Sequence, residues 1–165
     1  MKKCLPLLLV VLLSACAPLS KYNYQSQASS DPEFIFGDRF GGGSVTSPAR
    51  SFKVNIVDPN LNKCSDYAVV GTTSNHWMGT ASKTIQIKTP AGKAVALSGG
   101  YVLSTGFSIT TCMPPAVRFF PKNGSTYSVD VGVIDKRCML SIVQRLPDGK
   151  DEPVSGETLG SDCQK

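Results

Sequence analysis

Apolar and polar residues alternate with a period of two in several short runs between residues 51 and 146. Phe52, Val54 and Ile56 form one such run, and residues 127–133 form another. Turn-forming Pro, Gly, Asn and Asp residues separate the runs, and no stretch repeats its apolar residues at helical spacing. The pattern predicts about seven or eight short strands in an all-β domain. We expect an antiparallel β-sandwich, Ig-like or similar, with a small β-barrel as the alternative.

Two details of this pattern make sharper predictions. Asn123-Gly124 lies between the apolar runs 117–120 and 127–133. Because both residues of the pair tolerate positive φ, it is typical of a β-hairpin. Asp130 has the opposite phase to the valines on either side of it, so we expect its side chain to point outward into solvent.

The first fifteen residues have the three parts of a secretory signal peptide. Lys2 and Lys3 supply positive charge, residues 5–13 form an apolar run broken only by a proline, and Ser14 and Ala15 are small. The run is about half the ~20 residues that a membrane-spanning helix needs. We therefore interpret residues 1–15 as a signal peptide and not as a permanent transmembrane anchor.

The end of this segment, Leu13-Ser14-Ala15-Cys16, resembles the lipobox of bacterial lipoproteins. The resemblance implies cleavage before Cys16, a thioether-linked diacylglycerol on its sulfur, and an acyl chain such as palmitate on the new amino terminus. It also implies an address in the cell envelope. Ala17 stands where an Asp would resemble an inner-membrane retention signal, so in a Gram-negative cell the outer membrane is expected.

The residues after the predicted cleavage site divide into a tether and a domain. Residues 16–50 are rich in Ser, Gln, Asn, Gly and Pro, which indicates a lipidated tether that is flexible through about Pro32. Four apolar residues in the tether could dock on the domain as an arm or an added strand: Phe34, Ile35, Phe36 and Phe40. The β domain is expected over residues 51–165, and its segment FFPKNGSTYSVDV, before Cys138, resembles segments of uncharacterised bacterial lipoproteins.

Four cysteines remain in the domain after Cys4 leaves with the signal peptide. An even number of cysteines in an exported chain predicts two disulfides, and the sequence allows three pairings. We favour Cys64–Cys112 and Cys138–Cys163, because the second pair would hold the polar C-terminal tail on the domain. A Cys₄ metal site is not expected, since such sites use closely spaced cysteine pairs.

Charge and residue content narrow the classes of function. Seventeen basic residues face twelve acidic ones, and the basic residues are scattered, so nucleic-acid binding is not expected. His76 is the single histidine and no G-x-S-x-G motif is present, so we expect no catalytic residue, no metal and no cofactor beyond the lipid on Cys16. Trp77 with Tyr67 and Tyr101 is the candidate recognition patch for a protein partner.

Three functions remain open, and each predicts a different structural feature. A non-enzymatic binding or accessory lipoprotein, which we favour, should have an unpaired sheet edge or a flat apolar patch. An inhibitor or immunity-type lipoprotein that neutralises an envelope-targeting hydrolase should have a protruding loop with an exposed tip. An envelope hydrolase, the least favoured of the three, should have a cluster of buried titratable groups near His76 or Asp66.

Overall fold

The computed structural model describes residues 20–38, 49–57, 67–73, 84–104 and 107–159. Within these residues it contains eleven strands: β1 (Glu33–Phe36), β2 (Ala49–Val57), β3 (Ala68–Thr73), β4 (Ile85–Lys88), β5 (Ala94–Ser104), β6 (Ile109–Cys112), β7 (Val117–Phe119), β8 (Thr126–Ile134), β9 (Arg137–Arg145), β10 (Asp151–Pro153) and β11 (Glu157–Thr158). No helix in this part of the chain is long and apolar enough to cross a membrane.

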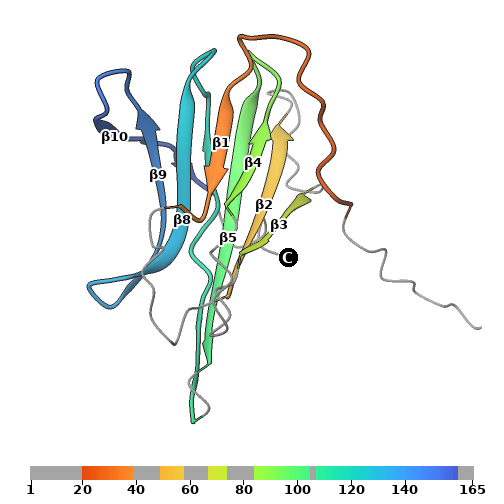
Figure 1. Ribbon diagram of the computed structural model, residues 1–165. Helices are drawn as coiled ribbons and strands as arrows, with labels where there is room; N and C mark the ends of the chain where they lie inside the picture. The colour runs from red at the N-terminus through yellow and green to blue at the C-terminus, as the bar shows by residue number, and fades with distance from the viewer. Residues whose placement is uncertain (1–19, 39–48, 58–66, 74–83, 105–106, 160–165) are drawn as a thin grey trace, which may run out of the picture.

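The strands form two sheets that pack face to face (Figure 1). Sheet I has the order β10-β9-β8-β1-β4. Sheet II has the order β11-β7-β5-β2-β3, with β6 also paired to β5. Neighbouring strands are antiparallel except β1 and β8, which are parallel. The predicted β-sandwich is confirmed, and neither sheet closes into a barrel.

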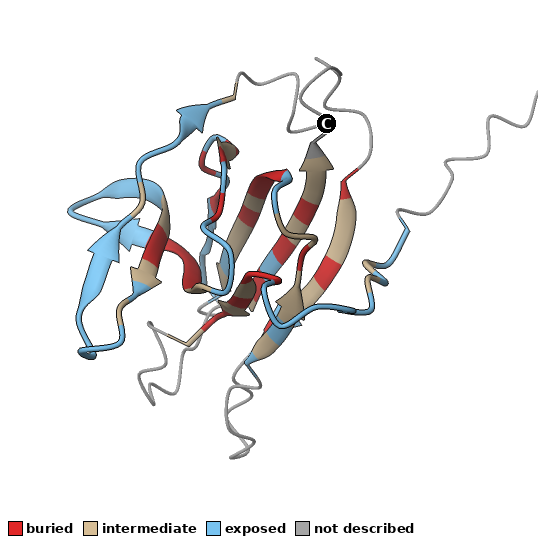
Figure 2. Cartoon of the chain, turned by 90° about the horizontal axis from the view of Figure 1, so that it is seen from above, coloured by how far each residue is buried: buried red, intermediate tan, exposed pale blue. Residues whose placement is uncertain are grey.

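The core lies between the sheets and is built from alternate residues of each strand. Phe34 of β1 stacks on Tyr127 of β8, with ring centroids 5.1 Å apart. Phe36 of β1 meets Phe52 of β2, also at 5.1 Å, and this second contact joins the two sheets. Figure 2 shows the buried positions recurring along the inner strands.

The folded domain begins well before residue 51, where we predicted its start. β1 lies inside sheet I between β8 and β4, and both of its phenylalanines are fully buried. Burying one such side chain is worth about 1.5–3 kcal/mol, which fixes this short segment in the core. Farther back, the backbone N–H of Tyr22 donates to the carbonyl of Val69 at the edge of β3 (2.9 Å). β1 is thus the added strand that Phe34 and Phe36 were expected to form, whereas the segment before Pro32, predicted to be a flexible tether, contains an arm that covers the edge of β3.

The predicted hairpin over residues 117–133 is also wrong. β7 belongs to sheet II and β8 to sheet I, so the chain crosses between the sheets at Asn123-Gly124. The turn itself is present, because Gly124 has a φ of 68° and the Ser125 N–H donates to the Lys122 carbonyl. Asn-Gly predicted the turn correctly, but a turn does not determine which sheet the next strand joins.

Candidate functional site

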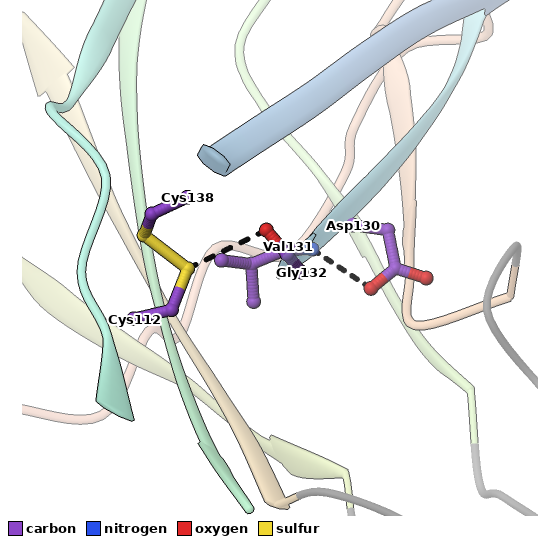
Figure 3. Close-up of a disulfide and its surroundings, with 5 residues drawn as sticks. All are labelled: Cys112, Asp130, Val131, Gly132 and Cys138. Atoms are coloured by element: carbon purple, nitrogen blue, oxygen red, sulfur yellow. Dashed lines mark hydrogen bonds between the residues drawn. A yellow bond between two sulfur atoms is a disulfide. The ribbon is translucent and has the colours of Figure 1, made fainter. Parts of the chain in front are cut away.

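A disulfide between Cys112 of β6 and Cys138 of β9 joins the two sheets at one end of the sandwich (Figure 3). Their Cα atoms are 5.4 Å apart, and the Cys112 Sγ lies 3.4 Å from the carbonyl oxygen of Gly132. Both predicted pairings, Cys64–Cys112 and Cys138–Cys163, are therefore wrong. The reason is topological: β6 folds back along β5, which brings Cys112 to the inner face opposite β9. Cys64 and Cys163 lie outside the described residues.

The disulfide ties together two hairpins, β5–β6 and β8–β9. The β8–β9 hairpin closes at Asp135 and Lys136, whose φ angles of 48° and 64° fit a type I′ turn. In the β5–β6 hairpin, Ser104 pairs with Ile109 beyond the last residue that β2 covers. Figure 1 shows this hairpin reaching farther than the β8–β9 turn.

Exposed apolar side chains gather on these two hairpins. Among the described residues eight large hydrophobic side chains are exposed, and seven of them form what we call the hairpin end: Val102, Phe107, Ile109, Met113, Val133, Ile134 and Met139. Phe107 is 103% exposed, as much as in a free peptide. The eighth, Phe120, follows Phe119, which pairs with Val95 near the start of β5. It therefore lies toward the opposite end of the sandwich.

The hairpin end is apolar on more than one side. Val102, Ile109 and Met113 share the outer face of sheet II, because strand register places residues 102 and 111 opposite each other and side chains alternate. Ile134 and Met139 share the outer face of sheet I by the same alternation. The apolar surface therefore wraps around the end of the sandwich.

Charges are distributed unevenly over the hairpin end. Residues 94–117, which include β5 and β6, contain no Asp, Glu, Lys or Arg. The neighbouring β8–β9 turn carries Asp135 with Lys136 and Arg137, and all three are exposed. An uncharged apolar hairpin thus stands beside a mainly basic turn.

Among the described residues, no strand covers the outer edge of β9 at the hairpin end. β10 pairs only with residues 143–145, and the last hydrogen bond on that side runs from the Val154 N–H to the Ile142 carbonyl. Because backbone groups alternate in direction along an antiparallel strand, those of Cys138 and Leu140 point to the same side as those of Ile142. Among the described residues no strand pairs with them there.

The structure does not assemble the recognition patch predicted from Trp77, Tyr67 and Tyr101. Tyr67 is 6% exposed and packs with alanines on the outer face of sheet II. Its hydroxyl has no hydrogen-bond partner among the described residues, and burial raises its pKa. Tyr101 packs against the main core, on the opposite face of the same sheet. Trp77 lies outside the described residues. Tyr67 is thus a buried residue and not an exposed contact.

Asp130 is buried, although its phase predicted that it would be solvent-exposed. Its side chain is 0% exposed, and Oδ1 lies 3.3 Å from Nε of Arg50, which is 6% exposed. Oδ1 also accepts a hydrogen bond from the Val131 N–H at 2.8 Å (Figure 3). The prediction failed because both faces of β8 are covered, from Tyr127 to Gly132. The ion pair joins β8 of sheet I to β2 of sheet II.

Asp31 holds the N-terminal arm on the domain. Its Oδ2 accepts hydrogen bonds from the hydroxyls of Ser26 (2.8 Å) and Tyr24 (2.9 Å), and its Oδ1 accepts one from the Ala91 N–H (3.2 Å). Burial alone would raise the pKa of Asp31, but these hydrogen bonds and one from the Ala28 N–H hold it below its ordinary value. The carboxylate connects the arm to the turn between β4 and β5.

The residues around which a catalytic or metal site was considered are only partly described. His76 and Asp66, around which a hydrolase site was considered, lie outside the described residues. Within the described ranges, no cluster of three or more His, Cys, Asp or Glu side chains could hold a metal ion. The buried pair of Arg50 and Asp130 lies between strands and serves the fold.

No known protein-family model matches the chain, and the curated proteins contain no significant match to it. Our sequence reasoning missed the hairpin end. The signal that could have revealed it is the uncharged stretch of residues 94–117, which is long for a segment that reaches the surface.

Proposed function

We propose that this chain is a lipid-anchored, non-enzymatic binding protein of the cell envelope that holds an extended segment of a protein partner at the open edge of β9. The observation that carries the proposal is this open edge at Cys138 and Leu140, with Ile134 and Met139 exposed beside it. Extended segments add to such edges through main-chain hydrogen bonds, and adjacent side chains provide specificity.

The proposed anchor is the lipid on Cys16, on the strength of the resemblance of Leu13-Ser14-Ala15-Cys16 to a lipobox. Two or three acyl chains hold a protein stably on a membrane, since each buried CH₂ contributes ~0.8 kcal/mol. Replacing Cys16 by Ser should abolish labelling with a radioactive fatty acid and leave the precursor uncut. Normal processing of that variant would contradict the anchor.

The partner is sought by crosslinking the tagged, lipidated chain in intact envelopes and purifying it. We expect one protein to co-purify in a defined ratio. Met139→Lys places a charge beside the open edge and should remove most of this protein. Phe120→Lys is the matched control, because it changes an exposed apolar residue at the opposite end and should leave recovery unchanged. Equal losses from the two variants would count against the edge as the binding site.

The second candidate is an inhibitor or immunity-type lipoprotein that neutralises an envelope-targeting hydrolase. The observation that favours it is the protruding β5–β6 hairpin with Phe107 fully exposed near its tip. Such a protein should inhibit its hydrolase stoichiometrically, and Phe107→Ser should abolish inhibition while Phe120→Ser should not. A partner with no hydrolytic activity would exclude this candidate.

A further inference from the structure

The β5–β6 hairpin lacks the charges that water-exposed surfaces carry. Surfaces of small soluble domains are commonly ~25–35% Lys, Arg, Glu and Asp. This hairpin projects from the sandwich with no charged residue over residues 94–117. Its outer face exposes Val102 (40%), Ile109 (73%) and Met113 (71%), and Phe107 stands fully exposed near the tip. The remaining exposed positions are mainly Ser and Thr, whose hydroxyls an interfacial environment accommodates.

The mainly basic turn beside the hairpin is set back from its tip. Phe107 lies five residues from Cys112, a span of at most ~17 Å that includes strand β6, whereas Lys136 lies two residues from Cys138, a span of at most ~7 Å. Because the disulfide joins the two cysteines, Phe107 can reach past Lys136 and Arg137 by up to about 10 Å. Apolar groups of interfacial proteins enter the boundary between headgroups and acyl chains to a depth of ~5–10 Å. At that depth both basic side chains would lie at the level of the phosphates.

We infer that the β5–β6 hairpin inserts into the interface of an anionic lipid bilayer, with Phe107 and Ile109 among the acyl chains and Lys136 and Arg137 on the lipid phosphates. Asp135 is the one acidic residue in the adjacent turn, and the two cations outnumber it. The active site of a hydrolase is a less suitable partner for this hairpin than a bilayer. The paired carboxylates typical of glycoside hydrolases would contact a hairpin that has no charged residue. The inference does not depend on the open edge of β9, which lies on the other hairpin.

The position of the predicted anchor agrees with this orientation. The carbonyl of Ser20 accepts a hydrogen bond from the Val69 N–H of β3. Val69 lies opposite Lys53 of β2, and Lys53 lies opposite Ser98 of β5, which is six residues before Ser104. Ser104, at the end of β5, therefore lies ~20 Å from the level of Ser20 along the strand direction. The four-residue span from Cys16 to Ser20 reaches at most ~14 Å, so an inserted tip and a lipidated Cys16 can meet the same bilayer.

The test uses the chain from residue 17 onward, which contains every described residue and carries no lipid. It is floated with vesicles of phosphatidylethanolamine and phosphatidylglycerol, and separately with phosphatidylcholine vesicles. We expect flotation with the anionic vesicles, weakened by salt because exposed charges are screened over ~10 Å at 0.1 M. Phe107→Asp should weaken binding roughly tenfold or more, as expected for the lost burial of one aromatic side chain.

Two control variants separate this inference from folding effects and from the proposed function. Phe120→Asp makes the same change at another exposed aromatic residue and should leave vesicle binding unchanged. Lys136→Glu with Arg137→Glu should abolish the preference for anionic vesicles. Circular dichroism and mapping of the Cys112–Cys138 bond verify that each variant is folded. Met139→Lys should still float, so loss of the protein partner alone leaves this inference intact.

Three outcomes would overturn the inference. The first is that the wild-type chain floats with neither kind of vesicle. The second is that Phe120→Asp and Phe107→Asp weaken binding equally. The third is that the chain forms a dimer without vesicles and Phe107→Asp dissociates it, which would identify a second copy as the occupant of the hairpin.

Discussion

At the scale of single residues, the polar groups inside this domain are what the sequence predicted least well. Alternation correctly assigned Phe52 and Val54 to the core, because hydrophobic burial is a property of the residue itself. The phase of Asp130, opposite to that of the valines beside it, predicts a solvent-exposed side chain, but the carboxylate is buried because it has a suitable partner. That partner, Arg50, is eighty residues away in the sequence, and local pattern carries no information about it.

Removing the Asp130 carboxylate should be strongly destabilising. Asp130→Ala leaves the Arg50 guanidinium buried without its counter-charge, and breaking a buried pair in this way costs about 3–5 kcal/mol. The comparison is Asp148→Ala, which breaks an exposed pair with Lys150 and should cost about 0–1 kcal/mol. Urea unfolding of the two variants measures both values. A cost for Asp130→Ala no larger than that for Asp148→Ala would contradict the structural role of the pair.

The Asp31 carboxylate should make stability depend on acid pH. Its pKa is lower in the folded chain than the ordinary value of ~3.9 expected when unfolded. Its contribution to stability is therefore fully present above that value and is lost as the pH falls through the folded pKa. Asp31→Asn should be less stable than the wild type at neutral pH, and the gap should narrow on acidification. Urea midpoints measured across acid pH test this, and a gap independent of pH would contradict it.

At the scale of elements, the sequence predicted the presence of strands better than their partners. Long alternating runs such as β8 were predicted correctly. For β1 the sequence left two alternatives open, an arm or an added strand, because four residues within a polar segment give a weak signal, and the structure shows the added strand. The disulfide could not be derived, since β6 and β9 belong to different sheets and pairing depends on how those sheets meet. The way the two sheets meet also determines that the exposed apolar residues of the β5–β6 and β8–β9 hairpins lie together at the hairpin end.

The Cys112–Cys138 bond should be detectable directly and should stabilise the domain. Non-reducing peptide mapping should recover the two cysteines in one linked fragment. The cysteines are 26 residues apart, and the chain-entropy model gives about 3.5 kcal/mol for closing such a loop. Cys112→Ser with Cys138→Ser should lower stability by about that amount. Recovery of Cys64–Cys112 instead would contradict the arrangement of the hairpin end.

Hydrogen exchange should show whether the edge of β9 is open. The amides of Met139 and Ser141 point toward β8 and should be protected, whereas those of Cys138 and Leu140 point outward and should exchange quickly. Two-dimensional NMR after transfer to heavy water resolves each amide. Equal protection of all four would mean that the edge is already paired in the free chain.

At the scale of the whole molecule, the protein is a β-sandwich with an apolar hairpin end. An uncharged hairpin projects from this end, and among the described residues a strand edge without a partner lies beside it. The proposed lipid on Cys16 and the proposed location in the cell envelope rest on sixteen residues of sequence. The hairpin end could be identified only from the fold. Its residues are apolar, and the sequence pattern alone assigns such residues to strands and not to a binding site.

Site-specific photocrosslinking in living cells tests the central proposal most directly. A photoreactive amino acid is placed at Met139, beside the open edge, and in a separate chain at Phe120 at the opposite end. The account predicts one discrete adduct from position 139, joined to a single extended segment of one envelope protein, and no such adduct from position 120. Adducts of equal yield from both positions, or from position 120 alone, would contradict it.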